Sequence, residues 1–296
     1  MDSCEGIIIK NQNGYFSVLP DGGTSGLYLA RSRGRLKRGS DLLVGDRVVI
    51  HPVGLQEALI EKILPRKNQL SRPPIANIDR IVLVASVKNP ETDLFLLDKM
   101  IAMAEDAGIK PVICISKTDL DPKAGQRMSS LYSRAGYPCA CVSSVTGEGT
   151  DSIRHMTGPG ITAFSGASGT GKSTLLNSLL GRDRFTAQAV SRKTGRGRNT
   201  TRHAELVPLD SHALVMDTPG YTALSAEGLL PSEAGFLFRD FRPYLGHCRF
   251  SDCLHESEPG CAVRAACTAG SLAESRYRSY LHLLHELKEF QLRRYD

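Results

Sequence analysis

The most constraining feature of the sequence is a glycine-rich stretch that follows a short apolar run, ITAFSGASGTGKS at Ile161–Ser173. Glycines let a backbone turn tightly with its N–H groups pointing inward, where they can hold phosphate oxygens at the start of a helix. A phosphate-binding loop of this kind requires a strand before it and a helix after it, and the apolar segments Ile161–Phe164 and Leu175–Leu180 supply both. A loop that merely turns is the alternative, and this flanking context disfavours it. The stretch therefore predicts a P-loop in an α/β domain.

The residue types within the loop indicate how phosphates would be held. The ammonium group of Lys172 would reach the β- and γ-phosphates, and the hydroxyl of Ser173 would bind Mg²⁺. We expect the other phosphate contacts from Gly166, Ala167, Ser168, Gly169, Thr170, Gly171 and Thr174.

Length and charge set broad limits on the protein. A chain of 296 residues has room for two or three domains. It contains no apolar run of about eighteen residues. Its start, MDSCEGIIIK, is acidic, and the apolar segment there is too short for a secretory signal. We therefore expect a cytoplasmic protein that does not bind membranes. The net charge of +6 suits an anionic partner without requiring one.

The first 70 residues are typical of a small β-barrel. Short apolar runs alternate with turn residues, which predicts five strands and an OB-type fold. The runs are Gly6–Ile9, Tyr15–Val18, Leu27–Ala30, Arg47–Ile50 and Ala58–Ile63. The segment Leu64–Pro74 is rich in proline and basic residues, which is typical of a linker.

A basic loop between the third and fourth runs is a candidate RNA-binding site. OB barrels often bind nucleic acid, and cationic side chains on such a loop can contact phosphates. A solvated charged loop is the alternative interpretation. The candidate residues are Arg31, Arg33, Arg35, Lys37 and Arg38.

From Asp79 the pattern changes to alternating strands and helices. Buried strands are predicted at Ile81–Ala85, Pro111–Ile115 and Pro138–Val142, with helices around Leu94–Ala104 and Ala124–Ala135. Polar motifs follow two of these strands, at the edge where open α/β sheets bind ligands. They are Ser116-Lys117-Thr118-Asp119 and the pair Ser143, Ser144.

The segment after the P-loop helix reaches a further motif. Residues 182–203 are polar and basic without a sustained period, and predict a loop. A hairpin of Ala204–Pro208 and Ala213–Met216 then delivers Asp217-Thr218-Pro219-Gly220.

Together with the threonines Thr200 and Thr201, these motifs resemble the five motifs of GTPases in a circularly permuted order. The resemblance implies that Asp119 binds the guanine N1 and amine, that the stem of Lys117 covers the base, and that Ser143–Ser144 supply an N–H to O6. Ser116 stands where Asn is usual. Taken alone, Ser116–Asp119 fits a helix-capping turn and Asp217–Gly220 fits a simple turn, but their placement after strands and their occurrence together with the P-loop favour a nucleotide site.

The remaining motif residues would act at the γ-phosphate. Either Thr200 or Thr201 would close on Mg²⁺, Asp217 would hold Mg²⁺ through water, and Gly220 would donate its N–H. Tyr221 stands where many GTPases place the glutamine that orients the attacking water, so we expect slow intrinsic hydrolysis. A partner or His203 would complete the site; a cap on the following strand is the alternative role of this histidine. The candidate catalytic residues are Lys172, Thr201 and His203.

A cysteine and histidine cluster predicts a structural Zn²⁺ site near the C-terminus. Cys248, Cys253, His255 and Cys261 have the spacing C-x4-C-x-H-x5-C, a full tetrahedral set. Free cysteines beside a surface histidine are the alternative. His247 would replace a ligand if the loop had another register, and Cys267 lies further along the chain.

The residues around this cluster suggest how it is attached. We expect aromatic side chains to pack the metal module onto the α/β domain, and a C-terminal helix with a basic face to dock beside it. The aromatics are Phe236, Phe238, Phe241 and Tyr244, and the helix spans Ser271–Leu292 with Arg276, Arg278, Lys288, Arg293 and Arg294 nearby.

The predicted fold is multidomain: an OB-fold RNA-binding barrel with its linker in residues 1–70, a circularly permuted α/β GTPase in 71–230, and a zinc-binding, α-rich module in 231–296. This combination resembles the RsgA (YjeQ/YloQ) family of bacterial GTPases that depend on the small ribosomal subunit. Asn199 and Arg202 depart from the family's usual residues in the switch. Two other classes remain open: an ATPase or kinase using the same loop, and a nucleotide-sensing RNA-binding adaptor with negligible turnover.

The resemblance implies a function that the residues alone do not. Members of this family hydrolyse GTP with Mg²⁺, bind the small (30S) subunit and its 16S rRNA late in maturation, and leave after hydrolysis. We expect the ribosomal subunit to stimulate hydrolysis and the protein to be a monomer.

Overall fold

The structure, a computed structural model, describes residues 2–22, 26–32, 42–71, 73–183, 185, 205–218 and 228–293. The chain forms two compact units, each assembled from two separate stretches of sequence. The first comprises Met1–Val82 and Arg154–Ala223, and the second comprises Leu83–Ile153 and Leu224–Asp296. The chain therefore passes between the units three times, and neither unit is a continuous piece of sequence.

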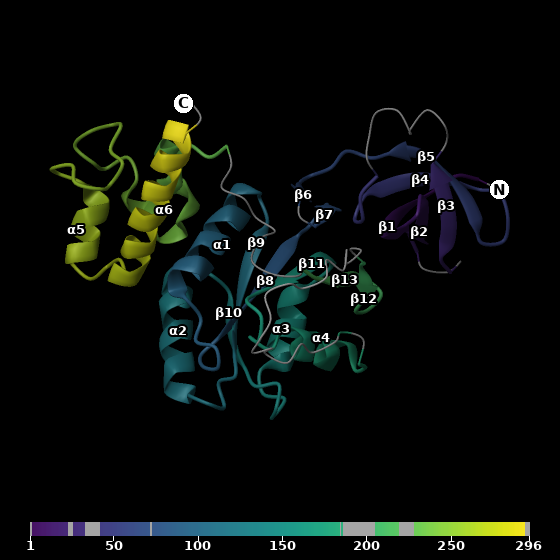
Figure 1. Ribbon diagram of the computed structural model, residues 1–296, viewed down its shortest axis with the longest axis horizontal. Helices are drawn as coiled ribbons and strands as arrows, with labels where there is room; N and C mark the ends of the chain where they lie inside the picture. The colour runs from purple at the N-terminus through teal and green to yellow at the C-terminus, as the bar shows by residue number, and fades with distance from the viewer. Residues whose placement is uncertain are drawn as a thin grey trace. The chain divides into compact units, whose positions relative to one another are not determined.

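Five strands of the first unit close into a barrel in the order β1-β2-β3-β5-β4 (Figure 1). They are β1 Cys4–Gln12, β2 Tyr15–Pro20, β3 Tyr28–Ser32, β4 Arg47–Pro52 and β5 Glu57–Ile63. All neighbouring pairs are antiparallel except β3 and β5. Alternate residues face the interior, where Ile8, Val18 and Ile60 are fully buried. The predicted five-stranded OB-type barrel is confirmed.

The turn between β1 and β2 follows from two residues. Asn13 and Gly14 have φ angles of 52° and 82°. A two-residue hairpin turn with positive φ at both positions matches the twist of the flanking strands, and Asn-Gly is the pair that tolerates it best.

The segment expected to be a linker is ordered against the barrel. It contains a two-stranded ribbon of β6 Gln69–Ser71 and β7 Pro74–Ala76. Arg66 donates from Nε and Nη2 to the two carboxylate oxygens of the fully buried Asp46, at 2.7 and 2.8 Å. A buried carboxylate requires such a partner, and composition alone could not reveal this pairing.

The α/β part is built on a six-stranded sheet with the order β10-β9-β8-β11-β13-β12. Its strands are β8 Arg80–Ser86, β9 Lys110–Ser116, β10 Cys139–Val142, β11 Gly160–Ser165, β12 Val207–Pro208 and β13 Ala213–Asp217. The helices connected to them are α1 Leu94–Asp106, α2 Pro122–Arg134, α3 Thr150–Thr157 and α4 Lys172–Leu180. The pairs β9–β10 and β11–β13 are parallel, and β12 runs antiparallel to β13. Near-continuous apolar runs correctly predicted these buried strands, because parallel sheets are covered on both faces.

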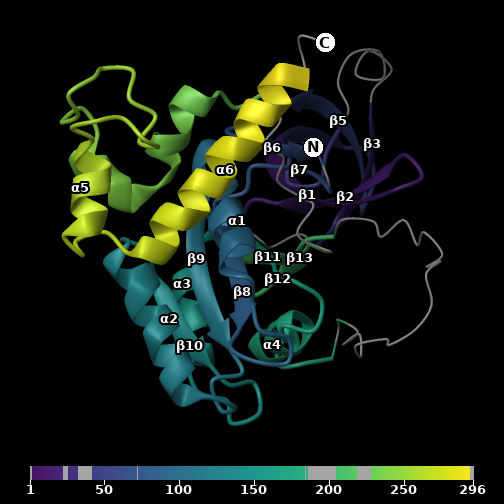
Figure 2. The ribbon, with the colours of Figure 1, turned by 60° about the vertical axis from the view of Figure 1, so that its left-hand side comes forward.

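The C-terminal part of the second unit is helical. Its elements are η3 Pro231–Leu237, η4 Arg239–Tyr244, α5 Ala262–Thr268 and α6 Glu274–Arg293. Figure 2 shows α6 lying along α1. Phe238, Phe241 and Tyr280 are buried, and their ring centroids lie 4.8–5.5 Å apart. The predicted packing role is confirmed for both phenylalanines but is wrong for Phe236, which is 61% exposed.

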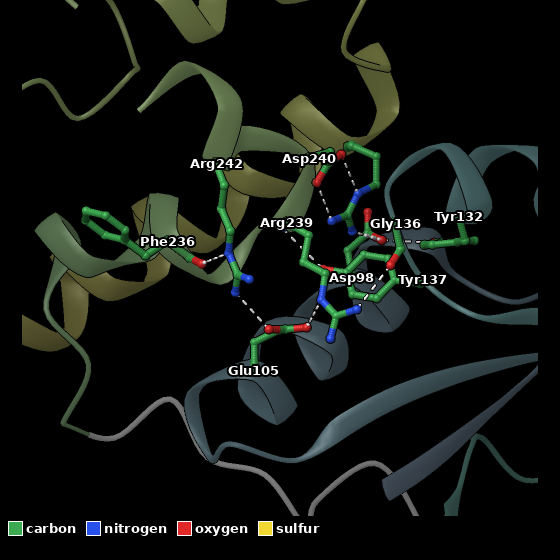
Figure 3. Close-up of polar contacts among 10 residues, drawn as sticks. Asp98, Glu105, Tyr132, Gly136, Tyr137, Phe236, Arg239, Asp240 and Arg242 are labelled. Carbon is green, nitrogen blue, oxygen red and sulfur yellow. Dashed lines mark hydrogen bonds and ion pairs between the residues drawn. The ribbon is translucent and has the colours of Figure 1, made fainter. Parts of the chain in front are cut away.

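A buried charge network also joins α1, η4 and α6. The side chain of Arg276 is fully buried and donates from Nη1 to Asp98 at 2.6 Å and from Nε and Nη2 to Asp240 at 3.1 and 2.9 Å. Asp98 also accepts a hydrogen bond of 2.9 Å from the hydroxyl of Tyr132 (Figure 3). The prediction that Arg276 lies on a basic outer face is wrong, because two carboxylates draw its guanidinium inward.

No helix among these described ranges is both long and apolar enough to span a membrane.

Candidate nucleotide and metal sites

The P-loop joins β11 to α4 within the first unit. Gly169 and Gly171 have φ angles of 82° and 90°, a region that glycine adopts without strain. Thr170 is fully buried and closes the loop by donating its hydroxyl to the carbonyl of Ala167 at 2.9 Å. Gly171 is the N-cap of α4 and has no side chain to cap the helix. The N-cap residue therefore makes no side-chain hydrogen bond to the first turn of α4, and a helix start of this kind can hold a phosphate.

Lys172 and Asp217 lie together beside this loop. The Lys172 ammonium is 2.9 Å from Asp217 Oδ1 and donates to the carbonyl of Thr218 at 2.7 Å. β13 is paired in register with β11, opposite Phe164, and this pairing places the carboxylate there. Asp217 Oδ1 is buried, and its charge is balanced by the Lys172 ammonium. A carboxylate beside the P-loop is a ligand of the kind that Mg²⁺ prefers, which fits the ion expected here.

The predicted guanine-binding residues form a second group, in the second unit. β9 and β10 are parallel neighbours with Ser116 opposite Val142, so Lys117–Asp119 and Ser143–Ser144 follow adjacent strand ends. The N–H of Thr118 donates to the carbonyl of Val142 at 3.3 Å, which joins the two loops. The arrangement brings both predicted motifs of this group to one edge.

The backbone conformations of these loops are restricted. Lys117 has a φ of 58° and donates its ammonium to the carbonyl of Asn89, and burial lowers its pKa although Asp119 opposes this. A Cβ on Gly149, whose φ is 75°, would meet the carbonyl oxygen of Cys141 at 1.9 Å. Only glycine therefore allows the loop that starts at Ser143 to return so close to β10.

Several predicted residues lie outside the described part of the chain. They are Thr200, Thr201, His203 and Gly220 of the nucleotide site and Arg33, Arg35, Lys37 and Arg38 of the basic loop. Arg31, on β3, lies in the described part of the chain. Its guanidinium donates a hydrogen bond to the hydroxyl of Tyr15 and lies 4.4 Å from the centroid of the Tyr15 ring.

The four predicted zinc ligands converge in the second unit. Their ligand atoms all lie within 4.8 Å of one another. Nδ1 of His255 is 3.5 Å from Sγ of both Cys248 and Cys261, and these sulfurs are 4.0 Å apart. Tetrahedral zinc, with bonds of about 2.3 Å to sulfur and 2.0–2.1 Å to nitrogen, separates its ligand atoms by roughly 3.5–3.8 Å. The group, completed by Cys253, therefore fits one zinc ion, and neither His247 nor Cys267 belongs to it.

The protein orients these ligands through the surrounding backbone. Backbone N–H groups of Ala262 and Arg264 donate to the sulfurs of Cys248 and Cys261, each at 3.4 Å. Burial raises the pKa of the Cys253 thiol to about 12 and lowers the pKa of His255. Zinc binding must therefore displace thiol protons, and the ion stabilises the resulting thiolates.

The loop between the ligands is braced from both sides. The Tyr277 hydroxyl donates to the carbonyl of His255 at 2.7 Å. The Glu258 carboxylate accepts from the N–H groups of Leu254, Glu256 and Ser257 at 2.7, 2.8 and 3.0 Å. Burial would raise the pKa of Glu258, but these backbone donors bring it below the usual value.

We expect Cys253→Ala to lose zinc and to loosen the C-terminal module, because three ligands hold structural zinc far less tightly than four. Bound zinc is measured after dialysis with a colorimetric chelator, and the thermal transition is followed in parallel. Cys267→Ala is the matched control, since this partly buried cysteine lies outside the group. Full zinc content in Cys253→Ala would refute the ligand assignment.

A basic hollow on α2 was not anticipated from the sequence. Lys123, Arg127 and Arg134 line a depression of about 520 Å³ that also contains Asp240. Because Asp240 is already paired with Arg276, the charge of the hollow is set mainly by the three cations. Their helical spacing along one face was the signal that could have identified them.

The comparisons with known proteins agree with this arrangement. Residues 63–227 match the family described as RsgA GTPase, and residues 5–60 match the RsgA N-terminal domain. A relative from Caldanaerobacter subterraneus subsp. tengcongensis, named small ribosomal subunit biogenesis GTPase RsgA, is 40% identical over 297 residues, covering 100% of this chain and 99% of its own. A relative of the same name from Geobacillus thermodenitrificans is 40% identical over 291 residues, covering 96% and 98%.

Two solved structures have the same fold. YjeQ from Thermotoga maritima superposes with a TM-score of 0.83 at 32% identity, covering 97% of this chain and 99% of its own. YloQ, described as a circularly permuted GTPase, gives a TM-score of 0.81 at 32% identity, covering 97% and 96%. The full-length similarity, together with the permuted motif order and the Cys/His group, shows that this chain belongs to the RsgA family of GTP-hydrolysing enzymes.

Proposed function

We propose that this chain binds the small ribosomal subunit late in its maturation, hydrolyses GTP there and leaves the subunit afterwards. The observation that carries the proposal is full-length similarity to relatives named small ribosomal subunit biogenesis GTPase, at 40% identity for two of them. The P-loop geometry supports nucleotide binding, and the Lys172–Asp217 pair beside it supplies the charges that a triphosphate and its cation need. The protein is proposed to act as a cytoplasmic monomer.

Two groups of residues would hold the nucleotide. Backbone N–H groups of Gly166–Thr174 and the ammonium of Lys172 would hold the phosphates. Ser116–Asp119 and Ser143–Ser144 would bind guanine, with the Asp119 carboxylate accepting from N1 and the exocyclic amine. This carboxylate discriminates against adenine, which lacks the same donors.

Magnesium would be held by oxygen ligands, as this hard cation prefers. Ser173, Asp217 and one of Thr200 and Thr201 are the proposed ligands, and the buried carboxylate of Asp217 beside the P-loop lysine supports this role. When bound, Mg²⁺ neutralises charge on the phosphates. Lys172, Thr201 and His203 are the proposed catalytic group, and Tyr221, in the position of the usual glutamine, favours completion of the site by the ribosomal subunit.

RNA contacts would come from the flanking regions. We propose that residues 1–70 bind 16S rRNA through Arg31, Arg33, Arg35, Lys37 and Arg38, that residues 71–230 act as the GTPase, and that residues 231–296 form the zinc module. The basic hollow lined by Lys123, Arg127 and Arg134 adds a further surface suited to phosphates.

The decisive measurement is GTP hydrolysis by the chain alone, with isolated small subunits and with large subunits as the control. We expect small subunits to raise the rate tenfold or more, toward the roughly 10³–10⁵-fold gain that a residue supplied in trans can give. Large subunits should leave the rate unchanged. Bound GTP without stimulation by small subunits would contradict the proposal and favour the adaptor function.

A further inference from the structure

Two phenylalanine rings are exposed beside the zinc-ligand loop. Phe236 in η3 is 61% exposed, and Phe250, between the ligands Cys248 and Cys253, is 42% exposed. Figure 3 shows the ring of Phe236 pointing away from the polar cluster around Glu105 and Asp98. Exposed apolar rings lose the stabilisation of burial, so their position calls for another partner.

Both rings line a single hollow of about 290 Å³ within the second unit. This volume lies just below the roughly 300–1,000 Å³ typical of pockets for drug-sized molecules. The zinc ligands Cys248, Cys253 and His255 form part of its wall, and the polar side chains of Ser232, Ser251 and Asp252 also line it. A hollow with aromatic walls and a polar rim suits a flat group that carries hydrogen-bonding atoms at its edge.

The walls of this hollow are held in place before any ligand arrives. The carbonyl of Phe236 accepts from Arg242 Nε at 3.3 Å, and Arg242 is paired with Glu105 at 2.9 Å. Phe250 lies in the loop between two zinc ligands, so the metal site fixes its backbone. Such preorganisation reduces the entropy lost on binding.

A cationic side chain lies beside one of the two rings. The guanidinium of Arg249 lies 5.5 Å from the centroid of the Phe250 ring and is exposed. It could pair with a phosphate while the ring stacks on the neighbouring base. An apolar protein segment would instead have to cover this cation and the Asp252 carboxylate, at a cost in desolvation.

We propose that this hollow binds one unpaired nucleobase of RNA, stacked against Phe236 and Phe250, with Arg249 contacting the adjoining phosphate. The inference rests on the proposed function, in which the partner contains RNA, and adds a base-binding site to it. Polar groups of Ser232 and Asp252 would meet the edge of the base. Sequence-tolerant stacking of this kind requires single-stranded RNA, because bases in a duplex are already stacked.

The absence of tryptophan from the sequence allows a direct test. Phe236→Trp and Phe250→Trp each create a protein with one tryptophan in the hollow. We expect a single-stranded ten-nucleotide RNA to quench this fluorescence saturably, and a duplex of the same length to quench it far less. Phe290→Trp on α6 is the control, since Phe290 is 43% exposed but does not line the hollow. Absent quenching in both reporters, or equal quenching in the control, would overturn the inference.

A second measurement does not depend on the reporters. The double variant Phe236→Ala, Phe250→Ala should bind the single-stranded RNA about 5- to 150-fold more weakly, the range for loss of base–aromatic stacking. Phe290→Ala should bind normally, and unchanged zinc content would show that the module is folded. Unaltered affinity of the double variant would overturn the proposal.

Binding to small subunits separates this inference from the proposed function. If small subunits do not raise the rate of GTP hydrolysis by the unmodified chain, the proposed function is wrong. Quenching of the tryptophan fluorescence by RNA would still support the base-binding site. The double variant could lose binding to small subunits while RNA neither quenches the two tryptophan variants nor competes with small subunits for the unmodified chain. In that case the hollow binds a protein segment, and the nucleobase inference is wrong.

Discussion

Replacing Arg276 by methionine should lower the free energy of unfolding by about 3–5 kcal/mol, the range for breaking a buried ion pair by removing one partner. Methionine fills much of the volume but leaves the carboxylates of Asp98 and Asp240 without their cation. Burial already raises the pKa of Asp98, and the Coulombic effect of Arg276 opposes this rise. Without the arginine, the pKa of Asp98 should rise further. Urea denaturation at neutral pH measures the effect.

Arg278→Met is the matched control for this prediction. Arg278 lies on the same helix, pairs with Glu274 at 3.3 Å and keeps 71% of its side chain exposed. Exposed pairs of this kind contribute roughly 0.3–0.5 kcal/mol. Similar losses in the two variants would contradict the importance given to the buried network.

Lys172→Ala should reduce the rate of GTP hydrolysis at saturating nucleotide by about 10²–10³-fold, the usual effect of removing a charged or hydrogen-bonding group at a reacting centre. The side chain is only 12% exposed and already lies in a site with Asp217. The rate of GTP hydrolysis should also fall in Lys172→Arg, because a planar guanidinium does not reproduce the compact charge of an ammonium. Single-turnover hydrolysis and equilibrium GTP binding separate the chemical step from affinity.

The control for this variant is Lys110→Ala, which removes the same charge from an exposed position at the start of β9. Its hydrolysis rate should equal that of the unmodified chain. A loss of less than about threefold in Lys172→Ala would be incompatible with a role at the reacting phosphate.

Local patterns predicted the parts of this fold that depend on nearby residues. The strands of the barrel follow from alternation and turn residues, and the zinc group follows from ligand spacing along one loop. The motifs of the nucleotide site were recognised because each is a short, continuous piece of sequence.

Features that depend on distant partners were not predictable in the same way. Arg276 and Asp98 are 178 residues apart in sequence, so the helix pattern placed the arginine on a solvated face. Phe236 and Phe238 have similar neighbours in sequence, yet one is exposed and the other buried, since the turn of η3 decides their direction. The ion pair between Arg66 and Asp46 was not predicted for the same reason.

The repeated crossing of the chain between its two units limits how the protein can be divided. A truncation at any single position removes part of at least one unit, because both are assembled from separate stretches. Ending the chain before Pro231, for example, would remove Arg276 and Asp240. The buried carboxylate of Asp98 on α1 would then have lost its cationic partner. Expression of isolated fragments is therefore a poor way to assign activities, and point substitutions in the full chain are the sounder approach.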